Sequence, residues 1–489
     1  MSFVRTLLLV LVAAGLGAWL WFVEKPGLEQ EARSNILLDF DPAAVERIGL
    51  AYPDGTSIGV VRENGAWKLT SPVVYAAEQS MIDNFLVTVK DAKIERRLAA
   101  DEAESPASYG LDSETGSQGR LELTLAGGVK LPAVRVGIAT PVDYQAFVRK
   151  EGDDDILVIP LLLHSSVRKT TDELRKKSLF GDDAGGFTKV VLEKPNEKIE
   201  LEQRGEGTWA MLSPVADDAD GEAVETMLSS LTSIDAVKFF DGDAADRALF
   251  GLAEGATVFT ATRADGSSLR FTLGKEATDA PAGFYFERAS DRQVAKVPDW
   301  VAKTFAPEAV ELRGRRLLAC KADEILSLSW TVGRGAEAES FTVSREAADK
   351  PWSLTPLSEG ETVNQKIIDN VLRALVEARA DSVVGDAAGD ADLATFGLDA
   401  PSARLEVSTA AGSCASLSAA PAPAAVEAPV PTMANRMEPI LRYRLKNAGR
   451  SAILETTAHQ YSRLSMKRTE FVEAPSPTPS AGGLLDKAP

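Results

Sequence analysis

The sequence is poor in the residues that carry most enzyme chemistry. Its 489 residues include two histidines and two cysteines. His164 and His459 alone are too few for a metal site, which needs further ligands nearby. Cys320 and Cys414 exclude a disulfide framework, and two free thiols are favoured over a single bridge. Neither cysteine lies near a histidine along the chain, and no Ser-His-Asp motif is present.

Positive charge is also scarce. The chain has 53 Lys+Arg against 72 Asp+Glu, a formal net charge of −19 at pH 7. Nucleic acid is excluded as a partner because its phosphates require a basic patch, and broad contact with anionic lipid is disfavoured. The glycine-rich segment 181–186 lacks the Lys-Ser/Thr ending of a phosphate-binding loop, so any nucleotide hydrolysis belongs to a partner.

Acidic residues cluster at 153–155, 217–220 and 241–246. The last cluster lacks the spacing and the closing glutamate of a calcium loop. Solvated carboxylates at turns and helix starts are the favoured interpretation, and a hydrolase using Asp241 and Asp243 is the weaker alternative. The sequence therefore predicts no catalytic, cofactor-binding or metal-ligating residue and no cofactor, and it favours a protein that is not an enzyme.

One apolar run stands near the start of the chain. Leu7 to Val23 carries no charge and spans roughly 26–30 Å as a helix, the thickness of a hydrocarbon core. Arg5 precedes the run and acidic residues follow it, so the positive-inside rule places the start in the cytoplasm and the rest outside. We expect an uncleaved single-pass transmembrane helix. A cleaved signal peptide is the alternative, although residues 22–26 form no small-x-small site.

A short pattern recurs three times, and its tryptophans lie 142 and then 143 residues apart. An aromatic-Gly-Leu triplet follows each copy at a similar distance. The copies are Trp67–Pro72 with Tyr109–Leu111, Trp209–Pro214 with Phe250–Leu252, and Trp352–Pro356 with Phe396–Leu398. We expect the tryptophans to pack in the core, and the central glycines to adopt positive φ or a close approach. Two landmarks in step predict three related modules of about 140 residues.

A helix is predicted after each tryptophan, because apolar residues recur at i, i+3, i+4 and i+7. The stripes are Ile82, Phe85, Leu86, Val89; Val224, Met227, Leu228, Leu231; and Ile368, Val371, Leu372, Leu375. Short alternating segments joined by turns predict three strands before this helix and four after it, with a second helix closing each module. The predicted fold class is antiparallel α+β: one N-terminal transmembrane helix followed by three repeated modules.

The predicted boundaries follow from these landmarks and from composition. They are an anchor at 1–24, a stalk at 25–35, the first module at 36–178, the second at 179–318, the third at 319–473 with a flexible Ala/Pro-rich insertion at 410–435, and a disordered tail at 474–489.

The Asp39–Pro42 opening, the Trp67–Val73 strand, the later Tyr-Gly-Leu triplet and the N-terminal run resemble the bacterial family known as domain of unknown function 4340. The middle copy matches with Met211 in place of Leu, and the third copy departs through a shorter Trp-to-Pro spacing. The resemblance implies association with ABC-transporter permease or auxiliary subunits and with gliding-motility-type systems. It implies no catalytic residues.

These observations together predict a non-enzymatic accessory or scaffold protein, anchored in the bacterial inner membrane by its N-terminal helix, with most of the chain in the periplasm. A module that binds envelope glycan or lipid is the alternative.

Overall fold

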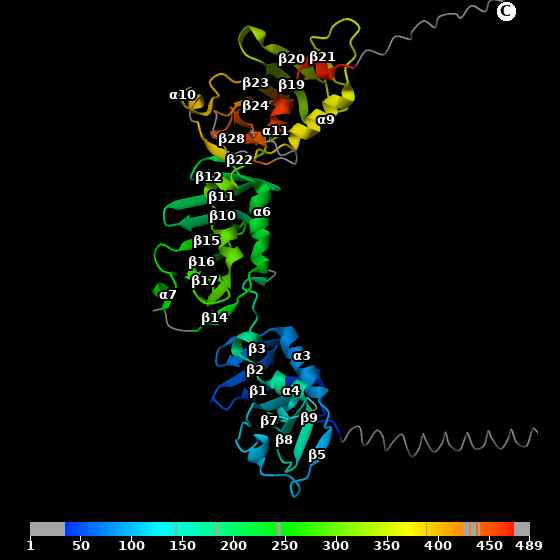
Figure 1. The fold of residues 1–489 in the computed structure, drawn as a ribbon, viewed down its shortest axis with the longest axis vertical. Helices are drawn as coiled ribbons and strands as arrows, with labels where there is room; N and C mark the ends of the chain where they lie inside the picture. The colour runs from blue at the N-terminus through cyan, green and yellow to red at the C-terminus, as the bar shows by residue number, and fades with distance from the viewer. Residues whose placement is uncertain are drawn as a thin grey trace, which may run out of the picture. The chain divides into compact units, whose positions relative to one another are not determined.

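The computed structural model describes residues 35–141, 144–181, 184–241, 246–387, 389–423, 430–431, 437–438 and 441–473. Three large antiparallel sheets dominate it, of nine, nine and eight strands (Figure 1). The predicted α+β class with a transmembrane helix is therefore wrong: the fold is mostly β. No helix within the described ranges is long and apolar enough to cross a membrane. Leu7 to Val23, the stalk to residue 34 and the tail from 474 lie outside them.

The first sheet has the order β4-β3-β2-β1-β6-β7-β8-β9-β5. Two meanders are joined through the β1–β6 pair, in which Ile48 faces Leu123. The strands are β1 (Val45–Ala51), β2 (Ser57–Glu63), β3 (Ala66–Ser71), β4 (Tyr75–Ala76), β5 (Arg96–Leu98), β6 (Gly119–Leu125), β7 (Val134–Ala139), β8 (Gln145–Lys150) and β9 (Ile156–Pro160), with helices α3 (Gln79–Lys90), α4 (Leu161–Val167) and α5 (Thr171–Leu174).

The second sheet repeats this order as β13-β12-β11-β10-β15-β16-β17-β18-β14. Its strands are β10 (Phe187–Lys194), β11 (Glu197–Gly205), β12 (Thr208–Ser213), β13 (Asp217–Asp218), β14 (Lys238–Phe240), β15 (Thr257–Arg263), β16 (Ser268–Ala277), β17 (Gly283–Arg288) and β18 (Val294–Pro298), with helices α6 (Gly221–Ser229), α7 (Asp246–Leu249) and α8 (Asp299–Phe305).

The third sheet has the order β21-β20-β19-β23-β24-β27-β28-β22. Its strands are β19 (Ile325–Val332), β20 (Glu339–Ser344), β21 (Ser353–Thr355), β22 (Ser382–Asp386), β23 (Ala403–Thr409), β24 (Gly412–Pro421), β27 (Arg442–Asn447) and β28 (Ala452–Thr457), with helices α9 (Gln365–Val376), α10 (Asp390–Leu393) and α11 (Ala458–Leu464). A small ribbon of β25 (Val430–Pro431) and β26 (Met437–Glu438) lies apart from this sheet.

The predicted insertion at 410–435 is wrong at its start. Residues Gly412–Pro421 form β24, which pairs with both β23 and β27. Alternating small residues explain the strand: Ala415, Leu417 and Ala419 face the core, so alanine fills the positions that larger residues take elsewhere. Most of the remaining predicted insertion lies outside the described residues.

The repeated motifs take the same structural roles in all three modules. Trp67, Trp209 and Trp352 are 1%, 2% and 5% exposed, so their predicted core role is confirmed. The prolines of the three copies all follow cis peptide bonds. The predicted helices are α3, α6 and α9, whose apolar stripes are buried apart from the half-buried Val371, with Leu231 just beyond α6.

The described chain divides into two compact units. The first unit holds residues up to Leu179 together with Asp235–Phe239, and the second holds Phe180–Ile234 and the residues from Phe240 onward. The second and third modules therefore share one unit.

Candidate functional site

Each module ends in a short turn whose last residue pairs with the segment after the tryptophan strand. The bridges are Ala77 with Arg175, Ala219 with Arg313, and Val363 with Val472. The two arginines stand at equivalent places, and both are buried, at 0% and 5% exposure. What surrounds each of them differs.

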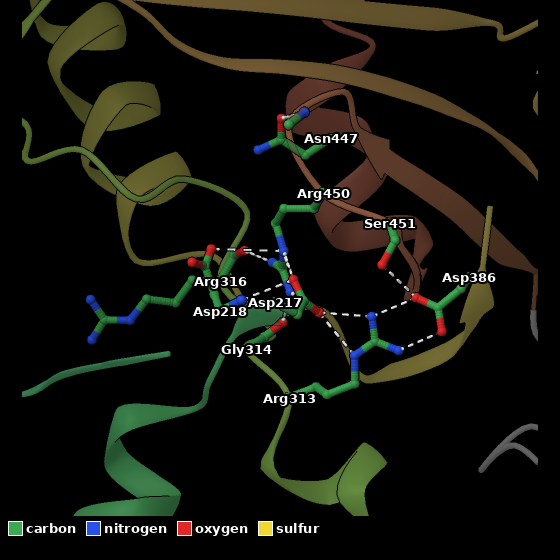
Figure 2. A network of polar contacts seen from close by, with 10 residues as sticks. Asp217, Asp218, Arg313, Gly314, Arg316, Asp386, Asn447, Arg450 and Ser451 are labelled. Carbon is green, nitrogen blue, oxygen red and sulfur yellow. Dashed lines mark hydrogen bonds and ion pairs between the residues drawn. The ribbon is translucent and has the colours of Figure 1, made fainter. Parts of the chain in front are cut away.

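In the second unit, Arg313 lies between two carboxylates that come from different modules (Figure 2). Its Nε donates to Asp217 Oδ2 over 2.8 Å. Its Nη1 and Nη2 donate to the two oxygens of Asp386, over 2.9 and 2.6 Å. This two-point contact is the geometry that makes an arginine–carboxylate pair strong and directional. Asp217 belongs to the second module and Asp386 to the third.

A second arginine closes the network on the side of the third module. Arg450, in the turn after β27, donates from Nε to Asp217 Oδ1 over 2.7 Å and from Nη2 to the carbonyl of Gly314 over 2.7 Å (Figure 2). Ser451 donates to Asp386 Oδ1 over 2.7 Å. The side chain of Asp217 is 0% exposed, and both of its oxygens are engaged by arginine.

Asp220, three residues after Asp217, makes a second set of contacts with arginines. It caps α6 by accepting from the Ala223 N–H, and it accepts from Arg315 over 3.2 Å and from Arg379 over 3.4 Å. Arg379 also pairs with Glu222 over 2.7 Å. Since Arg379 lies in the third module, this second set also crosses the junction.

The backbone of the connecting segment pairs with both modules. The Gly314 N–H donates to the Asp218 carbonyl in the second module. In the third module, the Leu317 N–H donates to the Ala378 carbonyl, and the Ala380 N–H donates to the Arg315 carbonyl. A Cβ at residue 314 would stand 3.0 Å from the Cβ of Asp218, which explains the glycine. The junction is thus a ladder of main-chain bonds reinforced by ion pairs.

The charges of this network keep its carboxylates ionised. Burial raises the pKa of Asp217, but hydrogen bonds and positive charge from Arg450 and Arg313 outweigh burial, so the pKa lies below its ordinary value. The hydrogen bond from Arg313 lowers the pKa of Asp386. Because such groups hold no proton near neutral pH and have no free oxygen to receive one, they fit a structural joint better than a general acid or base.

A cavity of about 140 Å³ lies beside the network, lined by Trp209, Asp218, Gly221, Arg315, Arg379 and Asn447 among others. This volume is below the roughly 300–1,000 Å³ of ordinary ligand pockets. Most of the charged side chains around it pair with one another, so the cavity is suited to solvent at the junction between the modules rather than to a ligand.

Arg175 of the first unit lies against two aromatic rings and near one carboxylate, whereas Arg313 lies between two carboxylates. Its guanidinium lies 4.8 Å from the ring centre of Phe239 and 5.3 Å from that of Tyr75. The two rings meet edge to face at 5.3 Å. Asp172 approaches Arg175 at 3.7 Å.

Several residues singled out from the sequence have partners in the structure. Arg97 pairs with Asp153 and Asp155 and holds a turn. Burial lowers the pKa of His164, and His459 contacts Arg463 within α11. Within the described ranges, no group of three or more His, Cys, Asp or Glu could hold a metal ion. Asp243 lies outside those ranges.

Two further sequence expectations have clear outcomes. The three glycines of the aromatic-Gly-Leu triplets, Gly110, Gly251 and Gly397, have φ of 67°, 69° and 70°, which confirms the predicted positive φ. The favoured free thiols are wrong, because Cys320 and Cys414 form a disulfide that joins segments 94 residues apart in the third module.

Sequence reasoning found Asp217 and Asp220 only as an acidic cluster, and it missed Arg313, Asp386 and Arg450. A signal for the arginines was present. Glu173-Leu174-Arg175 and Glu311-Leu312-Arg313 repeat the same tripeptide at the ends of the first two modules, and both glutamates complete capping boxes.

Comparison with protein families gives a match over two stretches, residues 67–217 and 209–401, to the family model described as Domain of unknown function (DUF4340). The two stretches begin at the equivalent tryptophans Trp67 and Trp209, as expected for a repeated unit. No match was found among the curated proteins or among the solved structures.

Proposed function

The chain belongs to the DUF4340 family, and from this premise we propose that it is a non-enzymatic extracytoplasmic scaffold that serves an ABC-type transport system or a gliding-motility-like system. One observation carries the proposal. The fully buried side chain of Asp217 is held by two arginines at the junction of two modules. Function resides in particular sites rather than in the fold, and the contacts at this site join the second module to the third.

The joint supports a scaffold because a protein that holds partners in register must resist bending between its parts. An isolated surface ion pair contributes little, but buried pairs linked in a network strongly disfavour states in which one partner is lost. The second and third modules thereby offer partners one continuous body.

The disulfide supports a location outside the cytoplasm. Disulfides persist in oxidising compartments such as the bacterial periplasm and are rare where thioredoxin and glutathione keep thiols reduced. In growing cells we expect Cys320 and Cys414 to resist alkylation by a maleimide until a reductant is added. The contradicting result is that both thiols react with the maleimide without reductant, in extracts that were quenched with acid and then unfolded.

Affinity purification from the native envelope tests the scaffold role. The tagged full-length chain is solubilised in mild detergent, and the recovered proteins are identified by mass spectrometry. We expect ABC-transporter permease or auxiliary subunits in amounts comparable to the bait, and smaller amounts with the Arg313→Met variant. Recovery of the bait alone from both samples would contradict the proposal.

A further inference from the structure

The third module has a cavity of about 420 Å³ on the face of its sheet opposite the main core. Ser416 and Ser418 of β24 and Lys446 of β27 line one wall, and Ala387, Leu393 and Leu398 line another. This volume falls within the roughly 300–1,000 Å³ of ordinary small-molecule pockets, as does the combination of an apolar wall with a few polar groups.

The aromatic-Gly-Leu triplet explains why the cavity opens in this module. In the second module the Phe250 carbonyl lies close above Gly274, where a Cβ would come within 2.3 Å of it, and the Lys275 N–H donates to that carbonyl over 3.0 Å. In the first module Gly137 takes the same place beneath Tyr109, where a Cβ would come within 2.1 Å of the carbonyl. Glycine thus lets the triplet settle on the sheet.

The third module lacks both features at the equivalent positions. Strand registers align Thr257–Leu273 with Ala403–Ala419, so Ala420 and Pro421 correspond to Gly274 and Lys275. Ala420 carries the methyl group that glycine omits, and proline has no N–H to donate. The segment with Phe396, Gly397 and Leu398 therefore lacks the hydrogen bond that the second module makes here, although Leu398 still packs against Ala420 in a small buried cluster.

Lys446 gives the cavity its charge. Its Cα is the direct cross-strand partner of that of Ser418, so the two side chains lie on one face of the sheet with Cβ atoms roughly 5 Å apart. Arg450, which also lines the cavity, is committed to Asp217, and Ser451 is committed to Asp386. The ammonium of Lys446 makes no hydrogen bond or ion pair with the described residues. Burial lowers its pKa, and the charges of Asp386 and Asp217 raise it less strongly.

A half-buried ammonium without a partner is costly unless a counter-charge joins it. We propose that this cavity binds a small organic anion, whose carboxylate pairs with Lys446 and Ser418 while a short apolar portion lies against Leu393 and Leu398. Neither Asp217 nor Arg313 lines this cavity, although Arg450 and Ser451 belong both to its wall and to the ion-pair network. The proposed binding does not depend on the scaffold role.

Calorimetric titration of the full-length chain tests the site with three probes. Hexanoate supplies charge and an apolar chain, hexanamide supplies the chain without the charge, and inorganic phosphate supplies charge without the chain. We expect saturable binding of hexanoate, with hexanamide and phosphate each at least about tenfold weaker, because each lacks one half of the recognition. No saturable binding of hexanoate, or equal binding of hexanamide, would overturn the proposal.

Variants localise the binding. Lys446→Met keeps the aliphatic stem and should weaken hexanoate about tenfold or more, whereas Lys446→Arg should retain most of the affinity. Lys366→Met, at an exposed position on α9 of the same module, is the matched control and should bind as the parent does. Thermal unfolding checks that each variant is folded, and protection of Lys446 from acetylation by hexanoate in the parent chain gives a readout that needs no substitution. Unchanged affinity in Lys446→Met, or unprotected Lys446 at saturating hexanoate, would overturn the proposal.

Discussion

Arg175 and Arg313 occupy equivalent positions in the repeat, and both are buried, but different groups stabilise their charges. Arg175 lies against the faces of Phe239 and Tyr75, whereas Arg313 lies between the carboxylates of Asp217 and Asp386. Aromatic faces attract a cation modestly and without strong direction. Paired carboxylates fix both the distance and the plane of the guanidinium. One position of the repeat thus carries a pliable contact in the first module and a rigid contact in the second.

Removal of Arg313 should produce the largest effect. Arg313→Met leaves Asp217 and Asp386 without this counter-charge, and breaking a buried pair in this way costs about 3–5 kcal/mol. We expect that loss in the free energy of local unfolding, measured by hydrogen exchange of peptides covering β13, α6 and β22. Arg204→Met, at a side chain that is 58% exposed and pairs with the exposed Glu202, is the control and should cost about 0–1 kcal/mol.

Opening the disulfide should come next. Replacing both Cys320 and Cys414 by alanine should lower the free energy of unfolding of the second unit by about 2–4 kcal/mol, because the bridge closes a long loop in the unfolded chain. Urea denaturation with and without reductant measures it. The first unit contains no cysteine and acts as an internal control, and an equal loss of stability in both units would contradict the assignment.

The equivalent change in the first unit should cost less. Arg175→Met keeps an apolar stem against the two rings but loses the cation–π attraction and the contact with the part-exposed Asp172, so we expect a loss of about 1–2 kcal/mol. Hydrogen exchange of peptides covering α3 and α5 measures it. If Arg175→Met costs as much as Arg313→Met, the proposed difference between aromatic and carboxylate surroundings is wrong.

Acid should sharpen the contrast further. The pKa values of Asp217 and Asp386 lie below their ordinary values in the folded chain, so their stabilisation is fully present above about pH 5 and is lost as the pH falls below about 4. We expect exchange around β13 and β22 to accelerate over that range before exchange around α3 does. Simultaneous acceleration in both regions would count against the electrostatic account.

The parts of the fold that local pattern decides were predictable. The apolar stripe of α9 and the alternation in β6 follow from periods that neighbouring residues impose, and the tryptophan spacing exposed the repeat. The two- and three-residue strands β4 and β5 have no such pattern, because they form only through pairing with distant partners. These short strands are therefore missing from the predicted order of three strands, a helix and four strands.

The candidate site was less predictable, because its members are far apart along the chain. Asp217, Arg313, Asp386 and Arg450 meet only when two modules pack, and no local period encodes that contact. The cavity around Lys446 depends on Ala420 and Pro421 standing where other modules have glycine and a donor, which becomes visible only from strand register.

A distance measurement between the second and third modules tests the central claim most directly. Both native cysteines are bonded to each other, so spin labels introduced through Arg204→Cys and Asp399→Cys report one distance by pulsed electron resonance. The account predicts a single narrow distance distribution in this labelled chain and a broad one when Arg313→Met is added. A broad distribution with Arg313 intact would contradict it.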